Sequence, residues 1–518
     1  MRKPAAPIAL SFALAAGPLV ASPAAEAELT RVDGVLGQSV TFEFQGDPLQ
    51  FWGLAFSTTT GPTPLVIFDP NDFRILNVGF ELIQLWQLGG LDGAGQGSLT
   101  IPLPATPTLA GIPFHSQMVT LFGAGTIVDE ISDPNAFVMQ LPTSSVLSLP
   151  VFPEDLDLHT ASPLPNGDVL IAGGTVDQGP TAFFAVDNYW IYGAQSGDLV
   201  QLATTMAETR TQHTATVLAD GRVLTVGGTD EQGVTRKTGE IFDPVTMTAT
   251  AIAPMSIERV MHSATLLADG RVLVCGGASQ ADISSPLSLV AAVLKSTEIY
   301  DPMTDTWTPG PDLPKPRALG NASRLGDGRV LVTGGLEVTT ILTVPVPSIS
   351  NDARRYDPTT NSFLSTASFP GPRGLHAQMT LPNGDAVIVG GVDGDLIFQS
   401  FFCLDTSATY NHVANTWTNG ATLAKARAFA ELQLLGGDLY IFGGAETFGI
   451  TTLSGIPVAE IEKAPQSLLS WTTVTSTALM REQPRTAIFD EGTRVLVTGA
   501  GTDGVFTVPD FTVDIFLP

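Results

Sequence analysis

Cysteine is nearly absent from this sequence, with only two residues in a chain of 518. So few thiols exclude a fold held together by a disulfide framework, and they exclude a zinc site built from paired cysteines. Cys275 and Cys403 lie in different repeats of the pattern described below, so we expect no bond between them. The protein must therefore depend on packing for its stability.

Positive charge is also scarce. Lysine and arginine together number 24 against 51 acidic residues, which gives a formal net charge of −27. This charge makes nucleic acid and anionic membrane surfaces poor partners, so we expect no nucleic-acid binding. Calcium is left open as a partner because carboxylates are its usual ligands, although the sequence contains no loop of the EF-hand type. We predict no bound metal and no cofactor.

Long apolar runs are missing as well. Beyond the N-terminus no run is long enough to cross a bilayer, so we expect no membrane insertion. The first residues carry Arg2 and Lys3, continue with a short apolar stretch, and reach the small-residue sequence Ala25-Glu26-Ala27. This order is typical of a secretory signal. The sequence predicts a cleavable, bacterial-type signal peptide over residues 1–27 and a secreted or periplasmic protein.

Glycine is plentiful, with 52 residues, and much of it belongs to a repeat that occurs seven times. The copies at 213–228 and 262–277 are the most alike, and each ends in a glycine pair. The pairs begin at Gly173, Gly227, Gly276, Gly334, Gly390 and Gly443, with the variant Gly499-Ala500-Gly501 in the last copy. In most copies an Asn-Gly or Asp-Gly turn precedes the pair, between runs of Val, Leu, Ile and Thr. This pattern predicts a β-hairpin, whose strands are here called a and b.

Two further strands, c and d, follow in each copy. They are best seen at 239–250, 297–308, 353–364 and 407–418, where an Asp-Pro or Asn break marks a tight turn. A four-stranded antiparallel sheet cannot bury both faces by itself, so consecutive copies must pack against one another. The pattern predicts a propeller with one blade for each copy.

Several spaced features carry a family resemblance: the Gly-Gly after strand b, Tyr-Asp-Pro closing strand c, a Trp six residues later, and an Arg ten residues beyond. Residues 143–518 resemble a kelch-repeat β-propeller of the galactose oxidase central-domain-like superfamily. The Trp slot holds Val200, Ala249, Trp307, Phe363, Trp417 and Trp471. The resemblance implies an all-β, seven-bladed propeller. The last copy lacks strand d, and we expect residues 143–150 to supply it.

Residues 28–142 lack this repeat but show alternating apolar residues, as in Val40, Phe42 and Phe44. Turn clusters such as that at 91–95 separate the alternating segments. We predict a small β-sandwich domain for this part of the chain.

The segments between strands b and c are long and uneven at 278–296, 336–352, 392–406 and 445–466, and variable loops on a rigid scaffold often serve recognition. An arginine recurs at the start of strand a, on the same side of the ring. In kelch propellers that bind acidic peptides, arginines at this place contribute to the ligand site. The resemblance therefore implies a ligand-binding set of Arg210, Arg259, Arg317, Arg373, Arg427 and Arg481. Alternatively, each arginine pairs with a carboxylate or carbonyl and joins the blades.

Four of the six histidines share one slot, three residues after the arginine position: His159, His213, His262 and His376. Imidazole is a common metal ligand, but each of these residues comes from a different blade, and Gly320 or Ala430 fills the slot elsewhere. We interpret them as hydrogen-bonded structural residues.

Two functions remain. Copper radical oxidases of similar fold need a tyrosine followed directly by a histidine ligand, and this chain has no Tyr-His dipeptide. We predict a non-enzymatic, exported scaffold that binds a protein or a glycan through its b–c loops and channel mouth, with no catalytic residue assigned. The alternative is a sugar-modifying enzyme in which Glu208 or Glu258, beside the ring arginines, acts as acid or base.

Overall fold

The computed structural model describes residues 28–32, 39–57, 60–64, 75–78, 87–102, 113–121, 128–132, 135–138, 145–150, 156–177, 183–194, 197–280, 290–341, 344–395, 400–447, 455–481, 483–489, 494–499, 501–502 and 512–518. The predicted signal peptide, 1–27, lies outside the described residues. Apart from one short helical turn at 290–292, the regular structure in these ranges is β-strand, which confirms the prediction of an all-β fold. The chain divides into two compact units near residue 135.

The first unit is built from short sheets. One sheet has the order β1 (Glu28–Val32), β2 (Ser39–Gln45) and β7 (Gln96–Pro102). A second has the order β10 (Asn135–Val138), β8 (Pro113–Leu121), β3 (Phe51–Ser57) and β6 (Gln87–Gly90), with β9 (Val128–Ile131) beside β8. β4 (Thr60–Pro64) pairs with β5 (Ile75–Val78). Phe44 of β2 contacts Trp52 of β3 with ring centroids 4.3 Å apart, so alternate residues of the two sheets share one core.

In the second unit, the described strands include seven sheets that share one pattern, in which strands a to d follow in order and run antiparallel. The first three sheets are β13 (Thr160–Pro163), β14 (Val169–Ala172), β17 (Asn188–Tyr192), β18 (Leu199–Thr205); β19 (Thr214–Val217), β20 (Val223–Val226), β21 (Gly239–Asp243), β22 (Thr248–Ala251); and β23 (Ser263–Leu266), β24 (Val272–Cys275), β25 (Thr297–Asp301), β26 (Thr306–Pro309).

The next three are β28 (Asn321–Arg324), β29 (Val330–Thr333), β32 (Ala353–Asp357), β33 (Ser362–Ser365); β34 (Ala377–Thr380), β35 (Ala386–Val389), β38 (Ser407–Asn411), β39 (Thr416–Asn419); and β40 (Glu431–Leu435), β41 (Asp438–Phe442), β42 (Val458–Pro465), β43 (Thr472–Arg481), extended by β46 (Gly501–Thr502). The last sheet contains β44 (Arg485–Phe489), β45 (Arg494–Thr498), β47 (Thr512–Leu517) and β11 (Ser145–Pro150).

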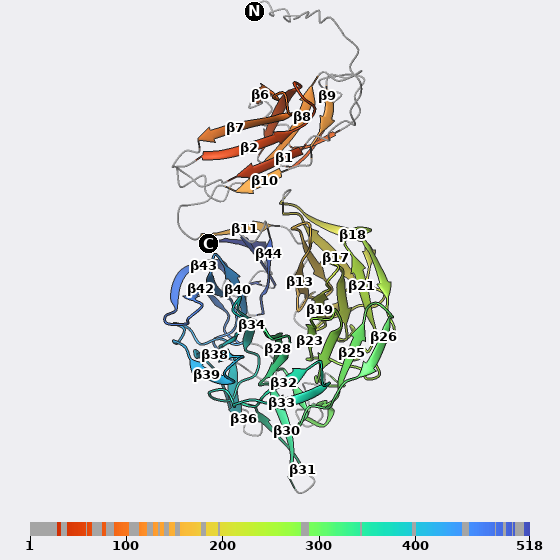
Figure 1. The fold of residues 1–518 in the computed structure, drawn as a ribbon, viewed down its shortest axis with the longest axis vertical. Helices are drawn as coiled ribbons and strands as arrows, with labels where there is room; N and C mark the ends of the chain where they lie inside the picture. Colours follow the sequence, from red (N-terminus) through yellow and green to blue (C-terminus); the bar gives the residue numbers. More distant parts are fainter. Residues whose placement is uncertain are drawn as a thin grey trace, which may run out of the picture. The chain divides into compact units, whose positions relative to one another are not determined.

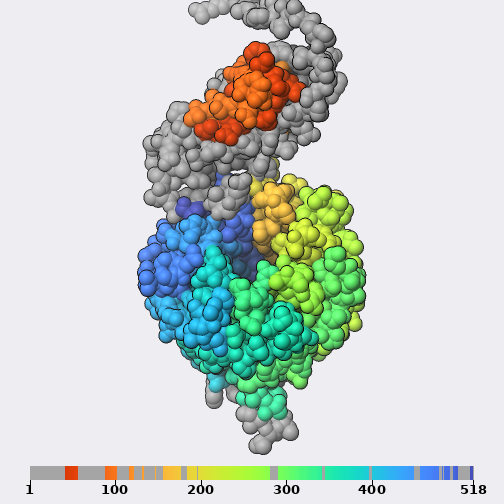
Figure 2. All heavy atoms as spheres, in the orientation of Figure 1, coloured from red at the N-terminus to blue at the C-terminus, as the bar shows by residue number. Residues whose placement is uncertain are grey.

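The a strands form a closed circle. Each contacts the a strand of the next sheet, from β13 through β19, β23, β28, β34, β40 and β44, and β44 contacts β13 again. Figure 1 shows the sheets around a common centre, and in Figure 2 the colours of this unit run round that centre in chain order. The last sheet is completed by β11, which precedes the first sheet in the chain. β11 pairs antiparallel with β47, and Val146 lies opposite Phe516.

Packing between neighbouring sheets explains why strand b is apolar along its whole length. All four residues of β20 and of β24 are buried. Leu224 and Val226 pack against Val272 and Val274 of the next sheet, while Val223 faces the preceding one. A strand that is covered on both faces has a nearly continuous run of apolar residues in its sequence, as in VLTV and VLVC.

Within the described ranges the b–c connections form three small sheets, two of which include a short strand from the d–a connection before strand a. These are β12 (Leu156–Asp157), β15 (Thr175–Asp177), β16 (Phe183–Ala185); β27 (Arg317–Ala318), β30 (Leu336–Ile341), β31 (Val344–Ile349); and β36 (Val392–Asp395), β37 (Ser400–Cys403). Val293, Leu336 and Val338 from two of the connections share a buried cluster, against which Phe401 packs. The strands alternate in direction, so the b–c connections lie at the same pole of the ring as the d–a connections, and the a–b and c–d turns lie at the other.

Deletion of residues 1–150 should destabilise the protein more than deletion of residues 1–142, because only the first removes β11. Phe516 is fully buried, and uncovering a side chain of this size costs about 2 kcal/mol. Urea unfolding of the two truncated proteins measures the difference. If the two truncated proteins were equally stable, β11 would not stabilise the ring by completing its last sheet.

Candidate functional site

The six arginines of the predicted ligand site are buried. Their relative exposures are 1% for Arg210, 0% for Arg259, 3% for Arg317, 1% for Arg373, 0% for Arg427 and 1% for Arg481. They recur around the ring in equivalent places, as the repeat predicts, but their guanidinium groups point into the protein. They therefore do not form an exposed ring of positive charge.

Each arginine accepts an N–H from the glycine pair of the preceding copy, and five of the six also donate from Nη1 to the carbonyl of the first glycine after strand b in their own copy. The guanidinium of Arg259 donates from Nη1 to the carbonyl oxygens of Gly276, 2.9 Å away, and Ser296, 3.0 Å away. The backbone carbonyl of the same arginine accepts the N–H of Gly228 in the preceding copy at 2.9 Å. Equivalent backbone bonds run from Gly174 to Arg210, Gly277 to Arg317, Gly335 to Arg373, Gly391 to Arg427 and Gly444 to Arg481.

The short distance between each arginine carbonyl and the glycine pair of the preceding copy explains why glycine occupies both positions. Both residues of each intact pair have positive φ, for example 60° and 90° at Gly276 and Gly277. A Cβ atom on Gly276 would lie 2.3 Å from the carbonyl oxygen of Arg317. A side chain would therefore strain the backbone and block the bond between copies.

Carboxylates from the c strands or just before them complete five of the six arginine sites. Glu298 lies 3.0 Å from Arg259, Asp352 lies 2.7 Å from Arg317, and Glu462 lies 2.5 Å from Arg427. Glu240 and Asp514 stand beside Arg210 and Arg481 at 3.7 and 3.2 Å. The acidic residue before Ile in GEIFDP and TEIYDP was the sequence signal for this partner. These contacts correspond to the alternative in which the arginines join the blades.

Arg373 has no carboxylate within ion-pair distance among the described residues, and it binds carbonyl and hydroxyl oxygens instead. Its Nη1 donates to Gly390 O at 2.9 Å and its Nη2 to Thr406 Oγ1 at 2.9 Å. Burial lowers the pKa of Arg373 to about 10, and Asp393 partly offsets this effect.

Neither of the two predicted carboxylates lines the central cavity of the ring, which is described below. Glu208 is partly exposed and accepts the hydroxyl of Thr238 at 2.6 Å, with Arg210 3.5 Å away. Glu258 is exposed on the loop before Arg259. The structure does not bring them together.

The four histidines of the shared slot are buried and bonded to threonines. His213 contacts Thr160 at 3.0 Å, and His262 contacts Thr214 at 2.9 Å. His376 contacts Thr333 at 2.8 Å, and His159 contacts Thr498 at 2.6 Å. Burial lowers the pKa of each of the four to about 3, with further lowering by nearby arginines. They are neutral at physiological pH and link neighbouring sheets.

A cavity of about 310 Å³ opens at the centre of the ring. Its lining includes the residue two positions after the arginine slot in all seven copies: Leu158, Gln212, Met261, Leu319, Leu375, Phe429 and Gln483. These residues come directly before strand a, so the cavity lies at the pole of the d–a and b–c connections. Sequence reasoning missed them because the repeat drew attention to the arginine and not to the variable position beside it.

Two charged residues of opposite sign line the same cavity. Glu431 and Arg485 stand in equivalent positions of neighbouring a strands, where other copies have Thr160, Thr214 or Asn321. Arg485 Nη1 lies 3.3 Å from Glu431 Oε1, and Arg485 Nε donates to His159 O at 3.0 Å. Burial raises the pKa of Glu431, and Arg485 opposes this shift. The sequence could have indicated these two residues, because they are charged where the other copies have uncharged residues.

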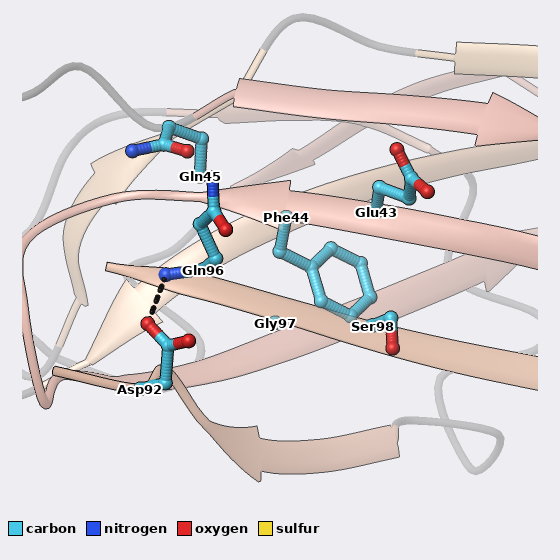
Figure 3. A pocket seen from close by; sticks show the side chains of 7 residues that line it. All are labelled: Glu43, Phe44, Gln45, Asp92, Gln96, Gly97 and Ser98. Carbon is cyan, nitrogen blue, oxygen red and sulfur yellow. Dashed lines mark hydrogen bonds between the residues drawn. The ribbon is translucent and has the colours of Figure 1, made fainter. Parts of the chain in front are cut away.

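A second cavity, of about 590 Å³, lies in the first unit along β2 and β7 (Figure 3). Glu43, Gln45, Gln96 and Ser98 line it together with Asp92. Asp92 accepts the backbone N–H of Ala94 at 2.8 Å and of Gln96 at 2.9 Å. The bond from Gln96, and after it the bond from Ala94, hold the pKa of Asp92 below its ordinary value. The carboxylate therefore stabilises the turn in which Asp92 lies.

Within the described residues, no group of three or more His, Cys, Asp and Glu side chains is arranged to hold a metal ion. No helix in the same ranges is long and apolar enough to span a bilayer. Cys275 is buried and Cys403 is partly buried.

Comparison with known proteins supports the same fold. Residues 261–314 match the model described as Kelch motif. Galactose oxidase from Gibberella zeae is 24% identical over 171 residues, covering 31% of this chain and 23% of that protein. Kelch-like protein 35 from Mus musculus is 28% identical over 159 residues, covering 31% and 25%. The chain thus spans about a quarter of the length of these curated relatives.

Among solved structures, a fungal alcohol oxidase of the AA5 family, in complex with copper, superposes with a TM-score of 0.53 at 16% identity. The superposition covers 72% of this chain and 76% of that chain. The fold is a kelch-type β-propeller. The resemblance inferred from the sequence is confirmed at this level, and the comparisons leave binder and enzyme both open.

Replacement of Arg427 by Met should destabilise the protein by about 3–5 kcal/mol, because it leaves the fully buried carboxylate of Glu462 without its charged partner. Urea unfolding measures the change. The double variant Arg427→Met, Glu462→Leu should recover much of the loss. Arg222→Ala is the matched control, since its pair with Asp220 is largely exposed and should contribute less than about 1 kcal/mol. Equal losses in the two single variants would contradict the joining role.

Stability should fall as the pH is lowered from about 6.5 toward 3. The pKa of the four histidines is about 3 in the folded protein against an ordinary 6.5, so the unfolded chain takes up protons first. At pH 5 each histidine lowers stability by up to about 2 kcal/mol. Urea unfolding between pH 8 and pH 4.5 measures this dependence, and His262→Gln should reduce it. An unchanged slope in this variant would show that His262 does not contribute.

Proposed function

We propose that the protein is an exported recognition scaffold, a seven-bladed kelch-type propeller preceded by a small β-sandwich. It binds a protein or a glycan at the pole of the b–c connections. The seven equivalent sheets, the circle of contacts between a strands and the shared core of β2 and β3 support this architecture. The order of residues in 1–27 supports export.

The observation that carries the binding role is that exposed apolar side chains stand on the b–c connections, at the pole where the central cavity opens. Phe184, Val234, Phe402 and Ile456 lie on four different b–c connections and are 42%, 53%, 54% and 57% exposed. On two other b–c connections, Val293 and Leu336 are buried in a shared apolar cluster. Exposed apolar side chains on a rigid surface around a cavity are typical of an interaction site. The net charge of −27 favours a neutral or basic partner over an acidic one.

A second function, a sugar-modifying enzyme, is favoured by Glu431. This carboxyl lies in the central cavity, its pKa is raised by burial, and a guanidinium stands 3.3 Å away. A carboxyl with a raised pKa in a cavity can exchange a proton with a bound sugar. If chemistry occurs at the channel mouth, Glu431 and Arg485 are better placed for it than Glu208 and Glu258.

Peptide and glycan arrays probed with the full chain test the binding role. The paired substitution Phe402→Ser, Ile456→Ser should reduce binding by more than about tenfold, because each removes an exposed apolar contact. Met303→Ser, Val413→Ser is the matched control, since these residues are 88% and 82% exposed in c–d turns at the other pole. Equal effects of the two pairs would contradict the proposal. Sugar turnover that is lost in Glu431→Gln would favour the enzyme instead.

A further inference from the structure

Six of the seven residues at the channel mouth have a left-handed backbone. Their φ values are 52° at Leu158, 54° at Gln212, 58° at Met261, 58° at Leu319, 52° at Leu375 and 59° at Phe429. These six residues are called the collar. Five of them are large and apolar, although side chains other than those of Asn and Asp are strained in this conformation.

The backbone of the collar has a structural role that requires no side chain. The N–H of Phe429 donates to Leu375 O at 2.9 Å, and the N–H of Leu375 donates to Leu319 O at 3.1 Å. Leu319 in turn donates to Met261 O at 3.1 Å. These bonds link consecutive copies around the channel. Glycine would make the same bonds at no steric cost.

The c–d turns at the other pole follow the usual preference. Their left-handed positions include Asp305, Asn361 and Asn415, with φ of 51°, 48° and 56°, while Met247 and Leu468 are apolar exceptions at 54° and 52°. The collar contains neither glycine nor Asn nor Asp. Strained residues persist where their side chains serve another purpose, and such strain gathers at ligand sites.

The collar side chains are partly buried and line the central cavity. Met261, Leu319, Leu375 and Phe429 come from consecutive copies and so form an apolar arc. Glu431 lies on strand a of the sixth copy and Arg485 on strand a of the seventh, at one end of this arc. The cavity therefore offers an apolar arc next to a hydrogen-bond donor and an acceptor, while Gln212, Asn321, Gln378 and Gln483 add polar groups to the rest of its lining.

We propose that the collar receives one apolar amino-acid side chain from a polypeptide partner, whose adjacent amide groups bind Arg485 and Glu431. A peptide group has one carbonyl oxygen for the guanidinium and one N–H for the carboxylate, which matches the pair. Aliphatic residues would remove water from sugar hydroxyls without replacing its hydrogen bonds, and Phe429 is the only aromatic residue in the described lining. A central apolar anchor in a pocket is typical of protein interfaces. This inference rests on the proposed function.

Saturation-transfer NMR on the full chain tests the inference with small probes. N-acetyl-L-leucinamide and N-acetyl-L-phenylalaninamide should bind, whereas N-acetyl-L-serinamide and methyl α-D-glucopyranoside should not. The double variant Leu375→Gly, Phe429→Gly should weaken binding by more than about tenfold, because the apolar contact is removed. Met247→Gly is the matched control, since it removes an apolar side chain at the same φ from the other pole.

Melting temperatures separate loss of contact from loss of structure. Glycine relieves strain at φ near 55°, so neither glycine variant should melt lower than the parent protein. Leu375→Asn, which also tolerates this backbone, should weaken probe binding without lowering the melting temperature. A lower melting temperature in all collar variants would assign these side chains to packing and overturn the inference.

Binding of the leucine and phenylalanine probes that is unchanged in the collar variants would also overturn it, as would collar-dependent binding of the glucoside alone. If array ligands depend on Phe402 and Ile456 but not on the collar, the inference fails and the proposed function stands. If no array ligand depends on the b–c pole, the proposed function fails.

Discussion

A buried guanidinium group needs partners for its N–H donors, and in five of the six recurrent arginines Nη1 binds the carbonyl of the glycine that follows strand b. The same arginine offers its own carbonyl to the glycine pair of the preceding copy. Each sheet is therefore fixed to its neighbour by a directional bond as well as by apolar packing. The glycine pairs, the carboxylates near strand c and the narrow choice of residues at the start of strand a all follow from this arrangement.

Because the arginines serve the ring, the function has to be sought in residues that vary from copy to copy. At the channel mouth these are the collar and the pair of Glu431 and Arg485. In a repeat protein, a residue that recurs in every copy usually has a structural role in the repeat itself. A residue found in one or two copies has no such explanation, and it stands out when the copies are compared in space.

The acidic character of the chain agrees with this view. The recurrent arginines are buried and bonded to carboxylates and carbonyls, and the net charge of −27 leaves the exposed surface with an excess of negative charge. The b–c pole adds exposed apolar side chains to that surface. In the proposed binding role, charge would select against acidic partners and apolar contact would supply the attraction.

The sequence by itself determined the β fold, the repeat and the spacing of the arginine, histidine and glycine slots, because turn chemistry and apolar periodicity are local properties. Only the tertiary structure decided that the arginines are buried, because burial depends on how neighbouring sheets pack and on the carboxylates they bring. It also decided that Leu375, Phe429, Glu431 and Arg485 meet at one cavity. These residues lie in three consecutive copies, and the packing of neighbouring sheets brings them together.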